Sequence, residues 1–211
     1  MMETATSPYR YFAVYKPRDM VSQFVSPDQV RLLGALDYDF PEGIHAVGRL
    51  DKDSEGLLLL TTNKKVTRLL FEGDIPHKRS YLVRVKNKVS PETLEQLRSG
   101  ISFRIKGGDY YNTGTCEVHI VEDAEKSFGI APDIMPHLPH SWLLITLTEG
   151  KYHQVRKMVS AVYHPCRRLI RVSIEDLLLG DMQPGEVREF SEEMFFRLLH
   201  IGTLPHEKTA I

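Results

Sequence analysis

The sequence has little cysteine and no long apolar run. Its two cysteines, Cys116 and Cys166, form no CxxC pair, so neither a disulfide framework nor a cysteine-rich metal site is expected, and a reducing cytoplasm is the predicted location. The longest aliphatic run, Leu57 to Leu60, is far shorter than the ~20 residues that cross a bilayer. Residues 1–8 do not resemble a secretory signal. We therefore expect a cytoplasmic protein without a membrane partner.

The sequence also lacks an excess of either charge. It holds 27 Lys or Arg against 28 Asp or Glu, which argues against a protein coated in positive charge. The charges are nevertheless segregated, since residues 149–172 contain six Lys or Arg and a single acid, whereas residues 175–193 contain seven acids. This pattern is typical of one side that faces a polyanion and one solvated acidic side. Charged runs that merely solvate strands and helices remain the alternative at this point.

The hydrophobic patterns predict strands and helices without strict βαβ alternation, hence an α+β fold with a mainly antiparallel mixed sheet. One folded domain is expected over residues 9–200, between a flexible N-terminus (1–8) and a flexible tail (201–211). Strands are predicted at 9–15, 44–47, 56–61, 80–85, 101–105, 113–121, 142–147, 167–174 and 184–190. Helices are predicted at 30–36, 64–71, 90–100, 152–163 and 192–199, with Ser90 as a cap and Gly100 as a left-handed end. Residues 122–140 form a proline-containing excursion of unassigned role.

The segment 48–56 carries the densest cluster of charges. Its three acids suggest calcium, but the EF-hand pattern fails because Leu59 and Thr62 stand where later carboxylate ligands are needed. We therefore expect no metal. The run from Leu57 to Leu60 predicts a buried central strand directly after this segment. An Asp at the mouth of such a strand, Asp51, is well placed to be held rigidly in a cleft, although a plain charged turn would give the same pattern.

The segment 149–158 places an amide and several cations at the start of a predicted helix. Backbone N–H groups at a helix start favour anions, although a helix with a solvated basic face would have the same spacing. No Cys or acid falls at ligand spacing around His153 or His164. We interpret both histidines as surface or RNA-contacting side chains.

Four motifs occur in a characteristic order. They are Gly-Arg-Leu-Asp-x-x-Ser-x-Gly-Leu-Leu-Leu-Leu-Thr from Gly48, Tyr81 within a strand, Glu-Gly-x-x-x-Gln-Val-Arg-x-Met from Glu149, and Arg-Leu-Ile-Arg-Val from Arg168. From about residue 11 to 190 the chain resembles the RsuA/RluB/RluE/RluF family of pseudouridine synthases. The Lys-Pro pair at 16–17, the turn at 22–24 and the stretch 139–142 are most similar to the RluE type. That type lacks the small S4 RNA-binding domain, for which we expect no room here.

The resemblance implies the pseudouridine synthase fold, with helices flanking the sheet and a central RNA-binding cleft. The implied reaction isomerises a specific uridine of ribosomal RNA, with 23S RNA expected, to pseudouridine, and it needs no cofactor or metal. Asp51 is the implied nucleophile, which attacks either the sugar C1′ or the base C6. The implied partner is ribosomal RNA, free or in an assembling large subunit, and the enzyme is expected to be a monomer.

Further roles follow from the same resemblance. Arg156 matches the arginine that pairs with the catalytic carboxylate, Tyr81 matches the ring that packs on a flipped-out base, and Arg49 matches a residue that fills the vacated stack. Five other residues are expected to hold phosphates or RNA edges, namely Lys16, Lys52, Gln154, Lys157 and Arg171. The chain departs from the family in having Arg79 where lysine is common, and in having Lys-Tyr-His-Gln at 151–154 where Arg-Asn-Arg-Gln is common.

Two other functions are compatible with parts of this pattern. A catalytically inactive RNA-binding or ribosome-assembly factor could share the fold, but a degenerate relative is expected to lose Asp51 first. A glycoside or nucleoside hydrolase could use Asp53 or Glu55 as a second acid. Neither Arg156 nor the basic flank is explained by a hydrolase. An active pseudouridine synthase is therefore the predicted function.

Overall fold

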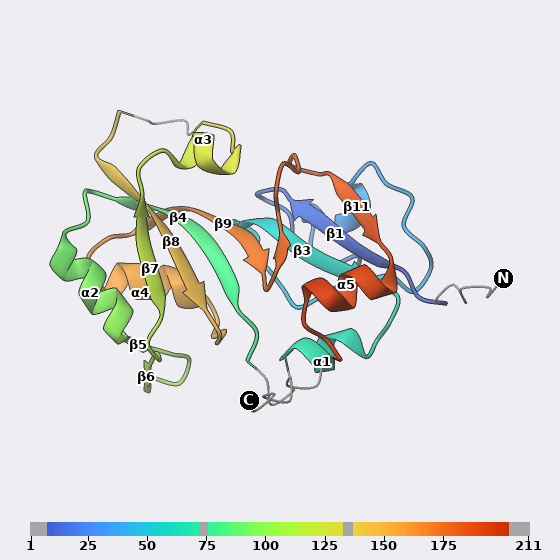
Figure 1. The fold of residues 1–211 in the computed structure, drawn as a ribbon, viewed down its shortest axis with the longest axis horizontal. Helices are drawn as coiled ribbons and strands as arrows, with labels where there is room; N and C mark the ends of the chain where they lie inside the picture. The colour runs from blue at the N-terminus through green and yellow to red at the C-terminus, as the bar shows by residue number, and fades with distance from the viewer. Residues whose placement is uncertain (1–7, 72–75, 133–136, 203–211) are drawn as a thin grey trace, which may run out of the picture.

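The computed structural model describes residues 8–71, 76–132 and 137–202 (Figure 1). The strands are β1 (Tyr11–Lys16), β2 (His45–Val47), β3 (Glu55–Thr61), β4 (Arg79–Lys86), β5 (Ser102–Arg104), β6 (Tyr110–Asn112), β7 (Glu117–Val121), β8 (His140–Leu147), β9 (Cys166–Ile174), β10 (Leu177–Leu178) and β11 (Val187–Phe190). The helices are α1 (Val66–Phe71), α2 (Pro91–Ser99), α3 (Ala124–Phe128), α4 (Gln154–Ala161) and α5 (Glu192–Leu198), with a 3₁₀ turn η1 at Leu33–Ala35.

A long mixed sheet forms the body of the molecule. Its strands follow the order β11-β1-β3-β9-β4-β8-β7, with β2 paired to β3 and β10 paired to β9. The pair β3–β9 is parallel, and the other named pairs are antiparallel. The strands β5 and β6 form a separate hairpin. The predicted α+β class with a mainly antiparallel sheet is confirmed, and the predicted buried central strand is β3, in which every residue is buried.

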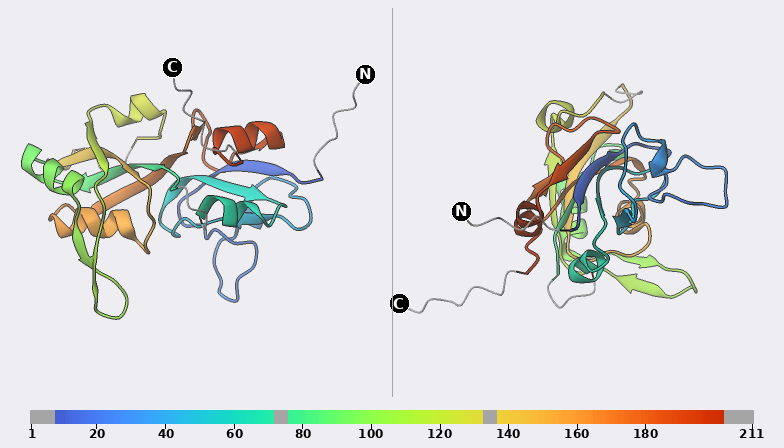
Figure 2. Two further views of the ribbon diagram at one scale, coloured as in Figure 1. Left: turned by 60° about the horizontal axis from the view of Figure 1, so that its bottom comes forward. Right: turned by 90° about the vertical axis from the view of Figure 1, so that its right-hand side faces the viewer.

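The two faces of the sheet are covered differently. Leu57 and Leu59 of β3 belong to a hydrophobic cluster that includes residues of α3 and α5, whereas Leu58 and Leu60 belong to a cluster on the other face, as the two-residue period of a strand requires. Figure 2 shows α3 and α5 on one side, and α4, the β5–β6 hairpin and the segment between β1 and β2 on the other. Side chains from this second side form the site described below.

The second face carries two separate hydrophobic clusters rather than one. The first contains Val83 and Val85 of β4 and the apolar residues of α2 and α4. The second contains Leu58 and Leu60 with the segment that follows β1. Tyr81 packs against both clusters. The middle strands of the sheet therefore form the base of the surface between the two clusters.

Several predicted elements are shorter in the structure. The helix expected at 152–163 spans only Gln154–Ala161, because His153 (φ 55°) and Tyr163 (φ 64°) have left-handed backbone conformations. The strand expected at 113–121 is limited to β7, and the helix expected at 30–36 is a single 3₁₀ turn. Gly100 has φ 107° and ψ 145°, an extended glycine conformation rather than the expected left-handed helical one.

The predicted flexible ends, 1–8 and 201–211, lie almost wholly outside the described residues. The part of the chain that is described contains no helix with the length and apolar character needed to cross a membrane.

Candidate active site

A cleft of about 1220 Å³ opens on the second face, between the two clusters. Its lining comes from segments that are distant in the sequence: the turn after β1, the loop 48–54, Tyr81 of β4, the loop and helix start at 147–155, and Arg171 of β9. Two of the motifs that the sequence singled out, at 48–56 and 149–158, therefore meet across one cavity.

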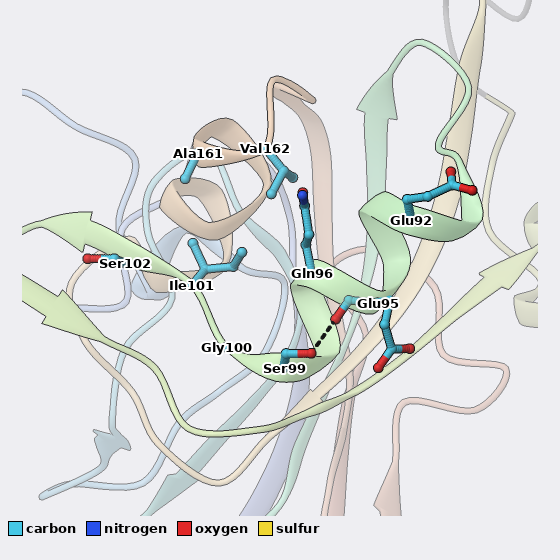
Figure 3. A pocket seen from close by; sticks show the side chains of 9 residues that line it. All are labelled: Glu92, Glu95, Gln96, Ser99, Gly100, Ile101, Ser102, Ala161 and Val162. Carbon is cyan, nitrogen blue, oxygen red and sulfur yellow. Dashed lines mark hydrogen bonds between the residues drawn. The ribbon is translucent and has the colours of Figure 1, made fainter.

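A second hollow lies between α2 and the end of α4 (Figure 3). Glu92 and Glu95 line it, together with apolar side chains such as Ile101 and Val162, and none of the described residues that line it is a cation. Such a surface repels a polyanion. The candidate site is the larger cleft.

The backbone around Asp51 is fixed by its neighbours. Leu50 is buried in the cluster that covers one half of the second face. The hydroxyl of Ser22 donates to the carbonyl of Leu50 at 2.8 Å and accepts the Leu50 N–H at 3.0 Å. On the other side, the Ser54 N–H donates to the Asp51 carbonyl at 3.0 Å. The Asp51 side chain is 29% exposed, so a fixed backbone presents a carboxylate that solvent reaches through the cleft.

The side chain that contacts the Asp51 carboxylate is His153. Its Nε2 lies 3.3 Å from Asp51 Oδ1, and its side chain is 34% exposed. The sequence does not predict this contact, because no acid lies at ligand spacing from His153 along the chain. The partner acid lies in a loop that is distant in sequence and close in space. The signal that could have pointed to His153 is its place inside the motif that begins at Glu149.

Arg156 does not make the ion pair with Asp51 that the resemblance implied. Its Nη2 instead lies 3.1 Å from Asp53 Oδ2, and it donates to the Asp53 carbonyl and to the Ser54 hydroxyl, each at 3.1 Å. The ion-pair expectation is corrected because the guanidinium reaches the loop two residues beyond Asp51. Arg156 ties helix α4 to the loop that carries Asp51.

Arg171 and Tyr81 lie side by side beneath the cleft. They are paired residues in the β9–β4 ladder, and the guanidinium of Arg171 interacts with the Tyr81 hydroxyl. Arg171 is 3% exposed and donates from Nε to the Leu57 carbonyl at 2.7 Å. Burial lowers its pKa, while the Tyr81 hydroxyl and the Asp51 charge act in the opposite direction. The side chain is thus enclosed at the base of the cleft, and its expected role in holding RNA stays a prediction.

Lys16, another predicted phosphate contact, is enclosed as well. The residue is completely buried, and its ammonium donates to the carbonyls of Met20 at 2.6 Å and Pro17 at 2.8 Å. Burial lowers its pKa to about 8, although the carboxylates of Glu55 and Asp51 favour the charged form. Lys16 therefore stabilises the turn after β1, in which Pro17 and Met20 lie.

The remaining predicted contacts divide into exposed and enclosed groups. Arg49 and Lys52 are exposed on the lining of the cleft. Lys157 is half-buried, with its ammonium 5.4 Å from the centre of the Phe103 ring. Gln154 is buried and accepts the Lys151 N–H at 2.8 Å, so it shapes the turn before α4. Its expected role in holding an RNA edge stays a prediction.

No group of three or more His, Cys, Asp or Glu side chains that could hold a metal ion occurs within residues 8–71, 76–132 and 137–202. The nearest approach to a charged catalytic constellation is the cleft, where Asp51, His153 and Tyr81 line one cavity above Arg171. One carboxylate with an imidazole, an aromatic ring and a buried cation suits nucleophilic chemistry on a base that stacks.

Comparison with known proteins decides the family. Residues 10–161 match the family model described as RNA pseudouridylate synthase. The chain belongs to the RNA pseudouridylate synthase family. The resemblance found in the motifs is thereby confirmed, and the chain is an isomerase of this family. The matched region includes the loop with Asp51, Tyr81 and Arg156.

Members of the family with curated names are similar over most of the chain. The ribosomal large subunit pseudouridine synthase E of Vibrio parahaemolyticus is 35% identical over 176 residues, 82% of this chain and 71% of the relative. The ribosomal small subunit pseudouridine synthase A of Escherichia coli is 30% identical over 185 residues, 87% and 71% of the two chains. A crystal structure of a pseudouridylate synthase superposes with a TM-score of 0.72 at 25% identity, over 92% of this chain and 76% of that one. The pseudouridine synthase fold is therefore shown.

Proposed function

We propose that this enzyme converts a uridine of large-subunit ribosomal RNA to pseudouridine, with Asp51 as the nucleophile in the cleft. The uracil is detached at N1, turned and rejoined to the sugar through C5. Asp51 attacks C1′ or C6, and the Tyr81 ring packs on the flipped-out base. Arg49 fills the stack that the base leaves. The observation that carries this proposal is the meeting of the loop 48–54, Tyr81 and the helix start at 149–155 in a single cleft.

The surroundings of Asp51 support the role of a nucleophile. Its backbone is held by Ser22 and Ser54, so the loop that presents the carboxylate does not need to be ordered at the moment of reaction. The cations of Arg171 and Lys16 are close enough for the Asp51 charge to affect their pKa values. The proposed nucleophile therefore lies in the electrostatic field of two buried basic side chains.

The choice of substrate rests on the relatives. Several relatives at 33–35% identity have names that assign them to the large ribosomal subunit, and those named for the small subunit are 29–30% identical. We propose 23S RNA, either free or in an assembling large subunit, and this places the enzyme in the cytoplasm. We further propose that residues 9–200 form the catalytic domain and that the enzyme acts as a monomer.

The direct test uses 23S RNA labelled with tritium at uracil C5. Rejoining the base through C5 releases the label to water, so the purified protein should release tritium from 23S RNA or from precursor large subunits. The Asp51→Asn variant should release none, because an amide is a poor nucleophile. RNA of the small subunit is the matched control. Mapping the product should show pseudouridine at one position.

Each rival function gives a different result. A hydrolase would release free uracil and leave an abasic site, and no pseudouridine would form. An inactive assembly factor would bind the RNA without tritium release. Measurable pseudouridine formation by Asp51→Asn, even at a few per cent of the normal rate, would overturn the assignment of Asp51.

A further inference from the structure

The Asp51 carboxylate has one close polar side-chain partner among the described residues, and it is a histidine. His153 Nε2 lies 3.3 Å from Oδ1, while Arg156 is engaged by Asp53 and Ser54. This contact joins the loop between β2 and β3 to the residue that precedes α4. In a histidine, the imidazole Nε2–H is a hydrogen-bond donor to a carboxylate in either the charged form or one neutral tautomer.

The backbone of His153 is specialised for this contact. The residue has φ 55° and ψ 29° at the N-cap position of α4, and its side chain makes no hydrogen bond to the helix start. A left-handed conformation in a residue other than glycine persists only where the surroundings impose it, and such residues cluster at functional sites. Here the conformation leaves the imidazole available to a group outside the helix.

The turn around His153 is held from both ends. Gln154 accepts the Lys151 N–H at 2.8 Å and donates from Nε2 to Glu149 Oε1 at 2.6 Å. Glu149 also accepts a hydrogen bond from the Tyr111 hydroxyl. These contacts fix the backbone of residues 149–154, so His153 is delivered to the cleft by a rigid turn.

The imidazole plane is fixed as well. The Tyr152 ring stacks on it with the ring centres 3.9 Å apart and the planes 19° from parallel. A stacked ring resists rotation about the bond that joins it to Cβ, so the imidazole stays within reach of Asp51. Tyr152 itself is 74% exposed, which means that the pair stands at the open side of the cleft.

We propose that His153 is a positioning residue for Asp51, whose Nε2–H, donated to Oδ1, orients the carboxylate so that Oδ2 is presented to the target nucleotide. This inference rests on the proposed function of Asp51 and adds a residue to it. No proton is transferred in this role, since the hydrogen bond only orients the nucleophile. In this chain His153 therefore contacts the nucleophilic carboxylate, the role that the resemblance assigned to Arg156.

Two substitutions separate the position of the nitrogen from the backbone conformation. In His153→Gln the amide nitrogen lies about where Nε2 lies, whereas in His153→Asn it lies about where Nδ1 lies. Asparagine tolerates the left-handed conformation better than glutamine or alanine does. A purely structural need at position 153 therefore favours Asn, and the proposed hydrogen bond favours Gln.

The activity experiment measures tritium release from the RNA by each variant. We expect His153→Ala and His153→Asn to lower kcat by about 10-fold to 100-fold, the effect of a lost charge-assisted hydrogen bond, with KM within twofold. His153→Gln should recover to within threefold of the natural enzyme. His119→Ala, a change at an exposed histidine of β7, should have no effect. Equal activity of all variants, or recovery by Asn rather than Gln, would overturn the proposal.

A second measurement does not depend on activity. The imidazole resonances of His153 in the NMR spectrum should shift in Asp51→Asn and stay in place in Asp53→Asn, because Asp51 contacts the ring whereas Asp53 is paired with Arg156. Resonances that move in neither variant, or equally in both, would refute the contact. If the natural enzyme releases no tritium while the Asp51-specific shift is present, the contact stands and the proposed function fails.

Discussion

Burial gives Lys16 an electrostatic behaviour that its sequence position does not suggest. Its pKa falls from the ordinary 10.5 to about 8 because burial removes water from the ammonium, against the pull of Glu55 and Asp51. The folded protein therefore loses this proton at a lower pH than the unfolded chain does. Between pH 8 and 10.5 the unfolded state binds more protons, so this group makes stability rise with pH over that window.

The first prediction at this scale concerns Lys16→Met. Between pH 7.5 and 10.5 the natural protein should become more stable relative to the variant. The difference between their free energies of unfolding should increase by about 3 kcal/mol, at 1.36 kcal/mol for each unit of pKa change. Urea unfolding at several pH values measures it. Burial raises the pKa values of Tyr15 and Cys166. Both groups titrate in both proteins, so their contributions cancel in the difference between the two free energies of unfolding. Parallel stability curves would contradict the prediction, and exposed Lys88→Met is the control.

A second prediction concerns the tie between Arg156 and the loop at 53–54. Arg156→Ala should lower kcat by about 10²-fold, because a displacement of about 1 Å in a positioning contact costs that much. In a double-mutant cycle with Asp53→Ala, the second substitution should have little further effect, since the two side chains form one contact. Additive effects of the two changes would show that Arg156 acts elsewhere.

The sequence predicted which residues lie at the site more accurately than it predicted which of their side chains contact one another. Asp51 lies in the predicted cleft because it precedes the buried strand β3, and Tyr81 lies there as the resemblance implied. The partner of Arg156 could not be predicted, because Asp51 and Asp53 are two residues apart in a turn and only the fold decides which one the guanidinium reaches. The burial of Lys16 could not be predicted, because a charged residue at the end of a strand is usually exposed.

At the scale of elements, the cleft depends on how closely β3 approaches β9. Gly56 of β3 is paired with Arg171 of β9 and has φ 101°. A Cβ added at Gly56 would lie 2.3 Å from the Arg171 carbonyl oxygen and 2.7 Å from its nitrogen. Only glycine allows this conformation and this approach. The absence of a side chain here brings Arg171 beneath Asp51.

Gly56→Ala should therefore destabilise the protein by about 3 kcal/mol or more, since backbone atoms rather than a flexible side chain must move. It should also abolish activity by displacing Arg171. Gly180→Ala is a matched control, because Gly180 has φ 59° and open space around its Cα, and it should cost about 1 kcal/mol. Thermal and urea unfolding measure both values. Equal losses in the two variants would show that the close approach has no importance.

The elements themselves were predicted where local patterns are strong. The run of leucines in β3 and the alternation in β4 correspond to strands in the structure, and Ser90 caps α2 by accepting the Thr93 N–H. Boundaries failed where a residue other than glycine has a left-handed backbone. His153 and Tyr163 shorten α4 at both ends, and no propensity indicates such residues because the surrounding fold imposes them.

At the scale of the whole molecule, the local charges matter more than the net charge of −1. Arg168 is engaged by Glu55 at 2.9 Å, and Arg171 is buried, so part of the basic segment does not face the solvent. The exposed cations on the lining of the cleft are Arg49, Lys52 and Lys151. Acidic residues at the start of α5 lie on the opposite side of the sheet (Figure 2). One face is thus suited to a polyanion.

RNA affinity should fall with salt by a slope of about two to three in log units, at about 0.7–0.9 for each phosphate that a cation neutralises. Replacing Lys52 and Lys151 by Ala should lower this slope by about 1.4–1.8 without a change in thermal stability. The control replaces Lys88 and Lys126, which are exposed and do not line the cleft. Filter binding over a range of salt concentrations measures the slopes. An unchanged slope in the first variant would show that the RNA docks elsewhere.

The parallel pairing of β3 with β9 also constrains when the enzyme can become active during its synthesis. Arg171 and the Leu57 carbonyl that it holds are 114 residues apart, and contacts of such separation form late because the intervening chain must first be ordered. A nascent chain that has emerged from the ribosome only as far as β8 contains Asp51 and Tyr81 but lacks α4 and β9. It therefore has neither the histidine nor the buried arginine of the cleft. The newly made enzyme therefore cannot modify RNA until its last third has folded.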